Sequence, residues 1–381
     1  DKVFDVAEAI EIATGIPGNQ VFDEWIQQLR SGYESVQASV ENSVWAQDTA
    51  SVIRVEPNGF FNFYPRIHEA SGTLAYLSNR GRATSWVSLY TTSIDSIRSE
   101  NGELATNYEP RLRSSLGDQP LYRPPVAGHL HMHEQEPAIK YINTAFDWSP
   151  DGRYLVYAVN KRNQYGEDYR DLFIYDIEHE EEIRLTESAR LESPAWHPEN
   201  RGIVVIQQSN GTQNLVWSRM PATQVLESSV GEKHRNLDMD SSWTPLSDFE
   251  NGQTMYSPVW HPKENVLYGA FADEHARQLF RVSMSFDSEG HLDQHRFEPL
   301  SKADFDLRDP VVSPDGEHLY FSADPDGRFN IYRVGLNSSG TLVHGTLEQM
   351  TNVVGGAFMP AVHQDRLYYS EYVANAYVLQ S

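Results

Sequence analysis

Three histidines at alternate positions in one short segment are the residues of this chain best suited to metal chemistry. They are His129, His131 and His133, and Glu134 follows them directly. On an extended strand alternate side chains share one face, so the three imidazoles could converge on a transition metal. A polar strand or loop face with part-exposed histidines explains the same residues without a ligand. A divalent metal held here is the one cofactor that the sequence suggests.

Six charged residues form a second candidate site. Several of them directly precede segments with the pattern of strands, as Glu192 precedes Ser193 and Pro194. If such strands surround a channel, these charges gather at one of its mouths. There they could recognise a ligand or peptide, or they could form ion pairs between neighbouring sheets. The set consists of Arg66, Arg190, Glu192, Asp306, Arg308 and Asp309.

The motifs of the common hydrolases are missing from the sequence. It contains no Gly-x-Ser-x-Gly, the turn that exposes a hydrolase serine. It contains no His-Glu-x-x-His either, because His133-Glu134 and His179-Glu180 lack the second histidine. No glycine-rich phosphate loop is present. We therefore expect no complete catalytic site within this chain.

A recurring phrase indicates the elements that position these residues. Its strong copies centre on Trp148, Trp196, Trp260 and Val312, and weaker copies contain Ile67 and Val362. From Trp148 onward the steps are 48, 64, 52 and 50 residues. Periods near 50 residues with four strands each are typical of propeller blades. Six copies predict an all-β, six-bladed β-propeller.

Each copy continues into a turn and a hairpin. In Ser149–Gly152 and Ser313–Gly316, proline sets the first turn corner and glycine tolerates the positive φ at its end. Runs rich in β-branched and aromatic residues follow, as expected for strands. One repeat position alternates between Ser and His, which favours hydrogen bonds that cap the turn over metal ligation. Its members are Ser149, His197, His261, Ser313 and His363.

The ends of the chain predict two domains and a closure. Residues 1–45 have helical spacing, with Phe22, Trp25, Ile26 and Leu29 after a breaker at 16–19, so we expect a helical appendage. Residues 46–381 form the propeller. The last copy supplies three strands, and the unassigned strand 51–55 is predicted to complete its blade, which would remove two open sheet edges. The helical pattern at Asp1 suggests a piece of a longer chain.

Composition narrows the partners and the compartment. The net charge of −24 argues against nucleic acid and anionic membranes. The sequence contains no run of about 18 apolar residues, so we expect no segment that inserts into a membrane. The absence of cysteine excludes disulfides and is compatible with a periplasmic or secreted bacterial protein.

The repeated phrases resemble those of TolB-type six-bladed propellers over about residues 50–381. The resemblance rests on the Ser-Pro-Asp-Gly turns and on acidic residues upstream, as in Leu191–Pro194 and Leu307–Pro310. Similar repeats occur in prolyl oligopeptidase and dipeptidyl peptidase relatives and in oligogalacturonate lyase. In the lyase, metal-binding histidines come from several blades, whereas His129, His131 and His133 are neighbours in one insertion. Residues 21–30 are similar to the closing helix of a zinc-peptidase-like domain, which implies the carboxy-terminal part of a larger protein.

These observations predict a non-catalytic propeller that binds or scaffolds a protein or peptide at its channel mouth. One alternative is a propeller hydrolase or lyase that acts on an oligosaccharide with a channel metal; histidines from several blades meeting at one ion would distinguish it. Another is the substrate-gating propeller of a peptidase whose catalytic domain lies outside this sequence. An exposed apolar face around Phe22 and Trp25 would favour that alternative.

Overall fold

The structure is a computed structural model that describes most of the 381 residues. The described residues are 5–42, 55, 60–79, 87–95, 142, 144–220, 243–272, 276–373 and 376–381. They form two compact units, one made of residues 1–52 with 352–354 and the other of the remaining chain. The predicted fold is confirmed: a mostly β, six-bladed propeller and a short helical segment.

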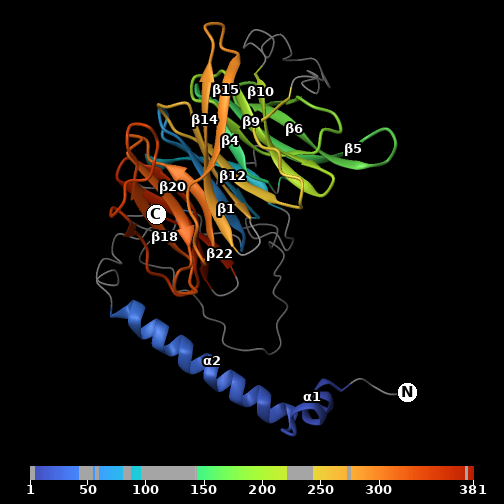
Figure 1. Ribbon diagram of the computed structural model, residues 1–381, viewed down its shortest axis with the longest axis vertical. Helices are drawn as coiled ribbons and strands as arrows, with labels where there is room; N and C mark the ends of the chain where they lie inside the picture. The colour runs from blue at the N-terminus through green and yellow to red at the C-terminus, as the bar shows by residue number, and fades with distance from the viewer. Residues whose placement is uncertain are drawn as a thin grey trace, which may run out of the picture. The chain divides into compact units, whose positions relative to one another are not determined.

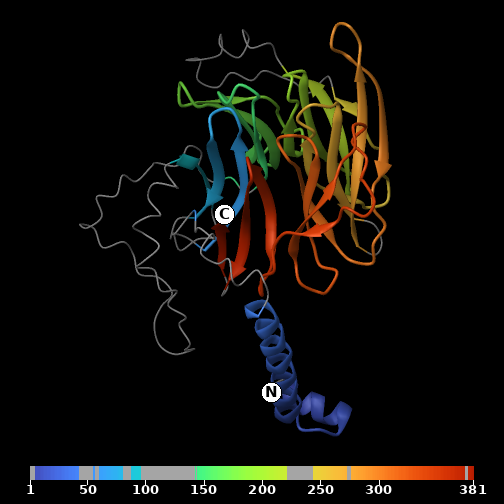
Figure 2. The same ribbon diagram turned by 90° about the vertical axis from the view of Figure 1, so that its left-hand side faces the viewer.

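Six antiparallel sheets form the blades, which we number in chain order (Figures 1 and 2). The first three blades are β1–β3 (Asn62–His68, Thr73–Ser78, Ser88–Ser93), β4–β7 (Phe146–Trp148, Tyr154–Arg162, Asp168–Asp176, Glu181–Arg184) and β8–β11 (Leu191–Trp196, Gly202–Ser209, Thr212–Arg219, Thr244–Pro245). The last three are β12–β15 (Thr254–Trp260, Val266–Ala272, Arg277–Phe286, Leu292–Pro299), β16–β19 (Leu307–Val312, His318–Ala323, Asn330–Gly335, Glu348–Gln349) and β20–β22 (Ala357–His363, Arg366–Val373, Ala376–Gln380).

The first strand of every blade is its inner strand. Each inner strand contacts the inner strands of both neighbouring blades, and β1 contacts β20, so the order of contacts closes into a ring. Apolar residues fill the space between successive blades. Trp196 and Tyr154, for example, stack with ring centroids 6.4 Å apart in a core cluster shared by the second and third blades. In a closed ring each sheet packs against a neighbouring sheet on both of its faces and can bury apolar side chains on both.

The first and last blades meet through the two ends of the propeller chain. Leu74 and Tyr76 share a core cluster with Tyr368 and Leu379. Figure 2 shows the blue strands of the first blade beside the red strands of the last. The amide of Val55 donates to the carbonyl of Leu379 at 2.8 Å. Residues 51–54 lie outside the described residues, so the pairing of a whole strand 51–55 with β22 stays a prediction.

The turn after each inner strand also joins neighbouring blades. The predicted capping is confirmed at His197 and His261, whose Nδ1 atoms each accept a backbone N–H at 3.1 Å from the residue two positions later. Their Nε2 atoms reach the next blade, where His261 contacts the carbonyl of Gly316 at 3.0 Å. His363 differs, because its Nδ1 contacts the carboxylate of Glu69 on the first blade at 2.7 Å. Burial of His197 lowers its pKa to about 4, so it is neutral near pH 7.

Two helices form the other unit. α1 (Val6–Thr14) begins at Asp5, whose carboxylate accepts the Ala7 amide at 2.9 Å, and it ends at Gly15 with φ of 73°. α2 (Gly18–Glu41) follows directly and runs for 24 residues (Figure 1). The helices contact each other at Gly18, where an added Cβ would lie 2.5 Å from the Cα of Ala7. The predicted breaker between the helices is therefore confirmed.

The contact between blades at Gly316 can be tested with a matched pair of glycines. Gly316 and Gly327 have φ of 77° and 80°, but only at Gly316 would a Cβ meet another side chain, His261 Cε1 at 2.6 Å. Gly327→Ala should lower the free energy of unfolding by about 1 kcal/mol through backbone strain. Gly316→Ala should lower it by about 1–3 kcal/mol more, because the buried ring must shift. Urea unfolding measures both values, and equal losses would contradict a tight turn-to-blade contact.

Candidate functional site

One repeat position supplies a residue from every blade to the channel mouth. This position lies three residues before the central residue of each phrase. The six residues at this position help to line a cavity of about 380 Å³, which we call the mouth pocket. Its members from the first to the sixth blade are Tyr64, Ala145, Ser193, Ser257, Asp309 and Met359. A pocket built from all six blades exists only when the ring is closed.

A β-bulge positions five of these six residues. Each of the five precedes a proline and has φ between 47° and 54°, an uncommon range for residues other than glycine. The pairing of the inner strand with the second strand shifts register at the same place in all five blades. Ala145 precedes Phe146 instead of a proline, and β4 pairs with β5 in one register. The X-Pro sequence therefore marks the bulges that shape the mouth.

Three arginines from different blades line the mouth pocket: Arg170, Arg277 and Arg308. Aromatic rings hold two of the guanidinium groups. That of Arg308 lies 4.0 Å from the ring centroid of Phe329, and that of Arg277 lies 4.8 Å from the ring centroid of Tyr256. Stacking restricts both side chains while leaving N–H donors at the ring edge.

Carboxylates pair with these arginines. Asp306 bridges two of them, because its Oδ2 lies 3.3 Å from Arg277 Nη1 and 3.2 Å from Arg308 Nη2. Glu192 pairs with Arg170, and Gln213 donates to Glu192 Oε1 at 2.6 Å. The arginine-rich wall is therefore held in place by ion pairs from within the propeller.

Asp309 is the acidic group at the repeat position itself. Ser257 donates its hydroxyl to Asp309 Oδ1 at 3.1 Å, while Asp309 Oδ2 is buried without a hydrogen-bond partner among the described residues. Burial raises the pKa of this carboxyl, and the positive charges of Arg308 and Arg66 oppose that increase. Asp309 is therefore a buried carboxyl whose charged form depends on these arginines and on the hydroxyl of Ser257.

Arg66 acts on a second buried carboxyl. Asp147 accepts the backbone N–H groups of Trp196 at 2.8 Å and Trp148 at 2.9 Å. Burial nevertheless raises the pKa of Asp147 to about 6, and the charge of Arg66 is the largest opposing effect. Arg66 therefore supplies positive charge to two carboxyls, Asp147 and Asp309, near the inner strands.

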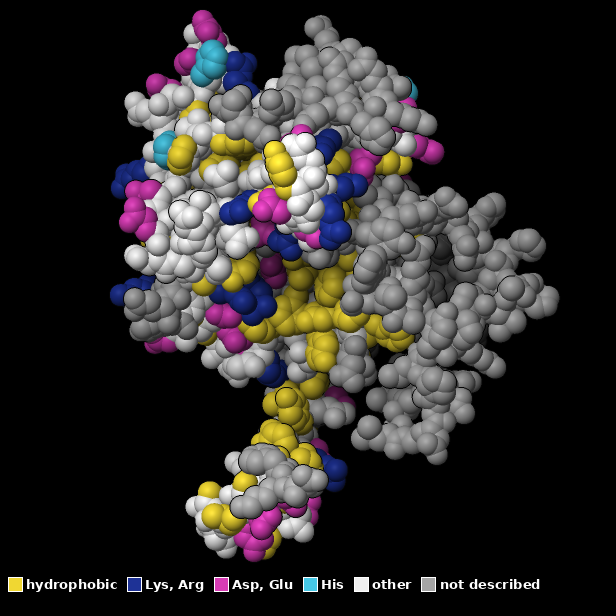
Figure 3. All heavy atoms as spheres, turned by 90° about the vertical axis from the view of Figure 1, so that its right-hand side faces the viewer, with side chains coloured by type: hydrophobic (Ala, Val, Ile, Leu, Met, Phe, Trp, Pro, Cys, Tyr) yellow, Lys and Arg dark blue, Asp and Glu magenta, His cyan; other side chains and the backbone are white. Residues whose placement is uncertain are grey.

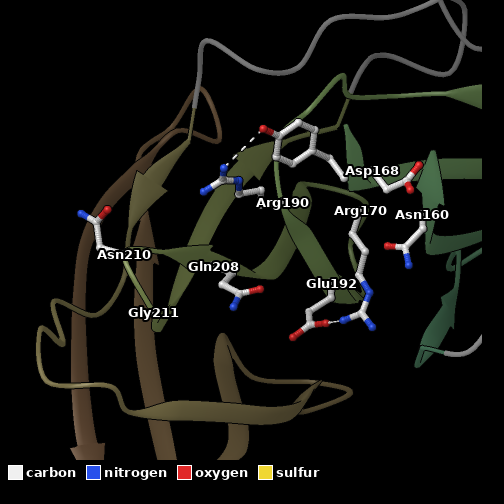
Figure 4. Close-up of a pocket in the computed structure, with 9 residues that line it drawn as sticks. Asn160, Asp168, Arg170, Arg190, Glu192, Gln208, Asn210 and Gly211 are labelled. Atoms are coloured by element: carbon white, nitrogen blue, oxygen red, sulfur yellow. Dashed lines mark hydrogen bonds and ion pairs between the residues drawn. The ribbon is translucent and has the colours of Figure 1, made fainter. Parts of the chain in front are cut away.

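A second cavity of about 410 Å³ shares a wall with the mouth pocket. It lies between the second and third blades, and Arg170 and Glu192 line both cavities. Figure 4 shows these two side chains pointing toward each other, with the amide groups of Asn160 and Gln208 nearby. Arg190 lies across this cavity, where its Nη2 donates to the hydroxyl of Tyr169 at 3.4 Å. The two cavities together form a charged, amide-rich surface.

Sequence reasoning located part of this surface. Glu192, Arg308 and Asp309 line the mouth pocket, Arg190 lines the neighbouring cavity, and Asp306 bridges Arg277 and Arg308. Their role in binding stays a prediction, as does that of Arg66. The repeat pattern gave no sign of Arg170, Arg277 or Asp147 as residues of this surface. The two arginines lie on β6 and β14, the third strands of their blades, and nothing in the sequence ties these strands to the phrase. Asp147 lies within the phrase, but the sequence does not show its partners.

The metal prediction has no structural test. His129, His131 and His133 lie outside the described residues. Within the described residues, no three His, Asp or Glu side chains are arranged to hold a metal ion. The described part of the chain also contains no helix with the length and apolarity needed to cross a membrane.

The closed ring and its six sheets define a six-bladed β-propeller, and TolB and peptidase propeller domains are among its structural neighbours. TolB from Acinetobacter baumannii shares 10% identity over 84% of this chain and 62% of that chain, with a TM-score of 0.41. A putative TolB from Agrobacterium tumefaciens shares 14% identity over 78% and 86% of the two chains, with a TM-score of 0.43.

A third neighbour is the β-propeller domain of the Trilobed protease from Pyrococcus furiosus. It shares 10% identity over 76% of this chain and 84% of that chain, with a TM-score of 0.39. The present chain spans less than two thirds of the length of the A. baumannii protein. No family model and no curated protein matches the sequence.

The link between Arg66 and Asp147 is testable by titration. Arg66→Gln should raise the pKa of Asp147 above its value of about 6, because the lost positive charge favoured the carboxylate. Carbon-13 NMR of aspartate side chains measures this pKa. Arg281→Gln, which removes a guanidinium paired with Glu298, serves as the control and should leave it unchanged.

The raised pKa of Asp147 predicts that the free energy of unfolding depends on pH. The folded pKa of Asp147, about 6, exceeds the ordinary value of 3.8. The folded state therefore binds the proton more tightly, and this contribution to stability is present below pH 3.8 and is lost as the pH rises through about 6. In Arg66→Gln the loss should extend to higher pH. Unfolding free energies that follow the same pH profile in both proteins would contradict the assignment.

Proposed function

We propose that this propeller is a non-catalytic module that binds a protein or peptide segment at its channel mouth. The observation that supports this most is the mouth pocket, to which every blade contributes one residue and three blades contribute an arginine. Five of the six repeat residues hold an uncommon positive φ. Strained backbone of this kind is frequent at ligand-binding positions, since the surrounding structure must hold it.

The charge of the pocket favours an acidic segment. The chain carries a net charge of −24, yet the mouth pocket is lined by three arginines and two acidic residues. Asp306 bridges Arg277 and Arg308, so three carboxylates in all balance the three arginines. Stacked guanidinium groups bind carboxylates with paired N–H donors. An acidic peptide would therefore meet less negative charge here than on the rest of this acidic protein, and it could share the guanidinium groups with Glu192 and Asp306.

The shape of the surface favours an extended chain over a compact small molecule. Two open cavities of about 380 and 410 Å³ meet at the pair formed by Arg170 and Glu192. Amide groups of Asn160, Gln208 and Gln213 lie along them and can pair with a peptide backbone. A peptide could place one side chain in each cavity and its backbone across the shared wall.

Peptide binding measured by fluorescence anisotropy tests the proposal. Labelled hexapeptides rich in Asp and Glu should bind more tightly than the matching Lys-rich set, and the affinity should fall with salt. Arg308→Gln should weaken the binding about tenfold, since it removes one charge-assisted contact. Arg333→Gln is the control on the same blade, because Arg333 pairs with Glu348 on the outer strands. Equal affinity for acidic and basic peptides, or equal effects of both variants, would refute the proposal.

A second proposal has one observation in its favour. In the helical unit Phe22 and Trp25 are 56% and 53% exposed, as expected if the propeller gates a peptidase domain encoded upstream. Peptidase activity of the natural polypeptide, compared with that of this chain alone, tests it. Activity in the longer polypeptide that changes with Arg308→Gln would support gating, and a natural polypeptide that begins near Asp1 would remove the basis for it.

We also propose a periplasmic or secreted location. The chain has no cysteine, so nothing in it depends on a reducing or oxidising compartment. Fractionation of cells that express the natural gene tests this proposal, and recovery from the cytoplasm alone would refute it.

A further inference from the structure

Helix α2 carries a regular apolar stripe that the propeller and its mouth pocket leave unexplained. Starting from Phe22, apolar residues recur in steps of four, three, four, three and four. From Ile26 to Val40 the mean step is 3.5 residues, that of the heptad repeat, and all six residues occupy its a and d positions. The d positions are Phe22, Leu29 and Val36, and the a positions are Ile26, Tyr33 and Val40.

Within the helical unit much of this stripe is open to solvent. The exposed fractions are 56% for Phe22, 37% for Leu29 and 61% for Tyr33, and Figure 3 shows hydrophobic side chains on the surface of this unit. Of the residues in the two described helices, Gly18 alone is buried. α1 contacts α2 at its first residue, Gly18, whereas much of the stripe further along α2 is exposed to solvent.

The width of the stripe indicates a helix as the occupant. A helix that packs on a globular domain has an apolar face about 100° wide or wider, whereas a stripe confined to a and d positions is the narrower seam of a coiled coil. On α2 the outward heptad positions b, c and f are polar apart from Val21, near the start of the helix, and Ala38. They hold Gln20, Val21, Glu24, Gln27, Gln28, Ser31, Glu34, Ser35, Ala38 and Glu41.

We propose that α2 pairs with α2 of a second copy of this chain as a parallel, two-stranded coiled coil. In this arrangement each residue of the stripe meets its own counterpart, so six layers form, of which the Tyr33 layer alone carries a polar group, its hydroxyl. β-branched Ile26 and Val40 at a positions, with Leu29 at a d position, favour two strands over three or four, whereas β-branched Val36 at a d position does not.

The residues beside the seam favour the parallel direction. In a parallel pair, Trp25 at a g position lies beside Arg30 of the second copy at the following e position, where the guanidinium can stack on the indole. Trp25 is 53% exposed and therefore available for this contact. In the antiparallel pair that matches all six layers, e positions face e positions. Arg30 would then meet Arg30 of the second copy, and the like charges would repel.

Sedimentation equilibrium of the full 381-residue chain tests the pairing. The mass should rise from 43.4 kDa toward twice that value as the protein concentration increases from about 1 to about 100 µM. Leu29→Glu places a carboxylate in the seam of both helices and should weaken the dimer at least about 100-fold. Gln28→Glu adds the same residue at the neighbouring outward position and should dimerise as the unaltered chain does.

A single cysteine tests the direction, because the chain has none of its own. Phe22→Cys should form a disulfide-linked dimer on mild oxidation, since a parallel pair places both copies of residue 22 in one layer. An antiparallel pair would separate the two sulfurs by about 27 Å along the helix axis. Glu24→Cys, on the outward face, is the control and should crosslink poorly.

Three results would overturn the proposal: a monomer throughout the concentration range, equal dimerisation of Leu29→Glu and Gln28→Glu, or a dimer in which Phe22→Cys does not crosslink. Thermal unfolding of the propeller in Leu29→Glu should match that of the unaltered chain, because Leu29 is exposed. Peptide binding at the mouth should also persist in this variant. Failure of the dimer and failure of the proposed function are therefore separate outcomes.

Discussion

Closure of the ring is the constraint on which the rest of the structure depends. A sheet of three or four strands is marginally stable alone, and here each sheet is covered by its neighbours. The final contact is made by residues more than 280 positions apart, such as Leu74 and Leu379 in one apolar cluster. His363 and Glu69 also contact each other between these two blades. Without the apolar cluster the first and last blades would each expose an apolar face.

The mouth pocket is a direct consequence of that closure. The bulge at each X-Pro sequence is local, but only the ring brings the repeat residues of all six blades around one cavity. The same geometry accounts for the unusual carboxyls. Asp147 and Asp309 lie on inner strands, where neighbouring blades remove water from around them and raise the pKa of both. The positive charge of Arg66 on the first blade opposes that effect at both residues.

Charge is distributed unevenly in this protein, and the distribution matters more than the total. The strong negative charge of the chain suits solubility and disfavours anionic partners. The arginines at the mouth stand out against it because aromatic rings and Asp306 hold them in fixed positions. Ordered guanidinium groups lose less conformational freedom on binding, which is why such a wall suits recognition. The helical unit has a different surface, in which the exposed groups are apolar and regularly spaced.

The sequence by itself determined the number of blades, the turn geometry and the helical segment. These features depend on local patterns: Gly316 at a positive φ, proline after each bulge, and the breaker between the two helices. The sequence also located Glu192, Arg308 and Asp309, because they stand beside a repeated phrase. Only the tertiary structure brought Arg170 and Arg277 to the same pocket, since strands far from the phrase approach the channel only when the blades pack around it. Tertiary packing also decided that His363 contacts Glu69 rather than its own turn, because that partner lies 294 residues away along the chain.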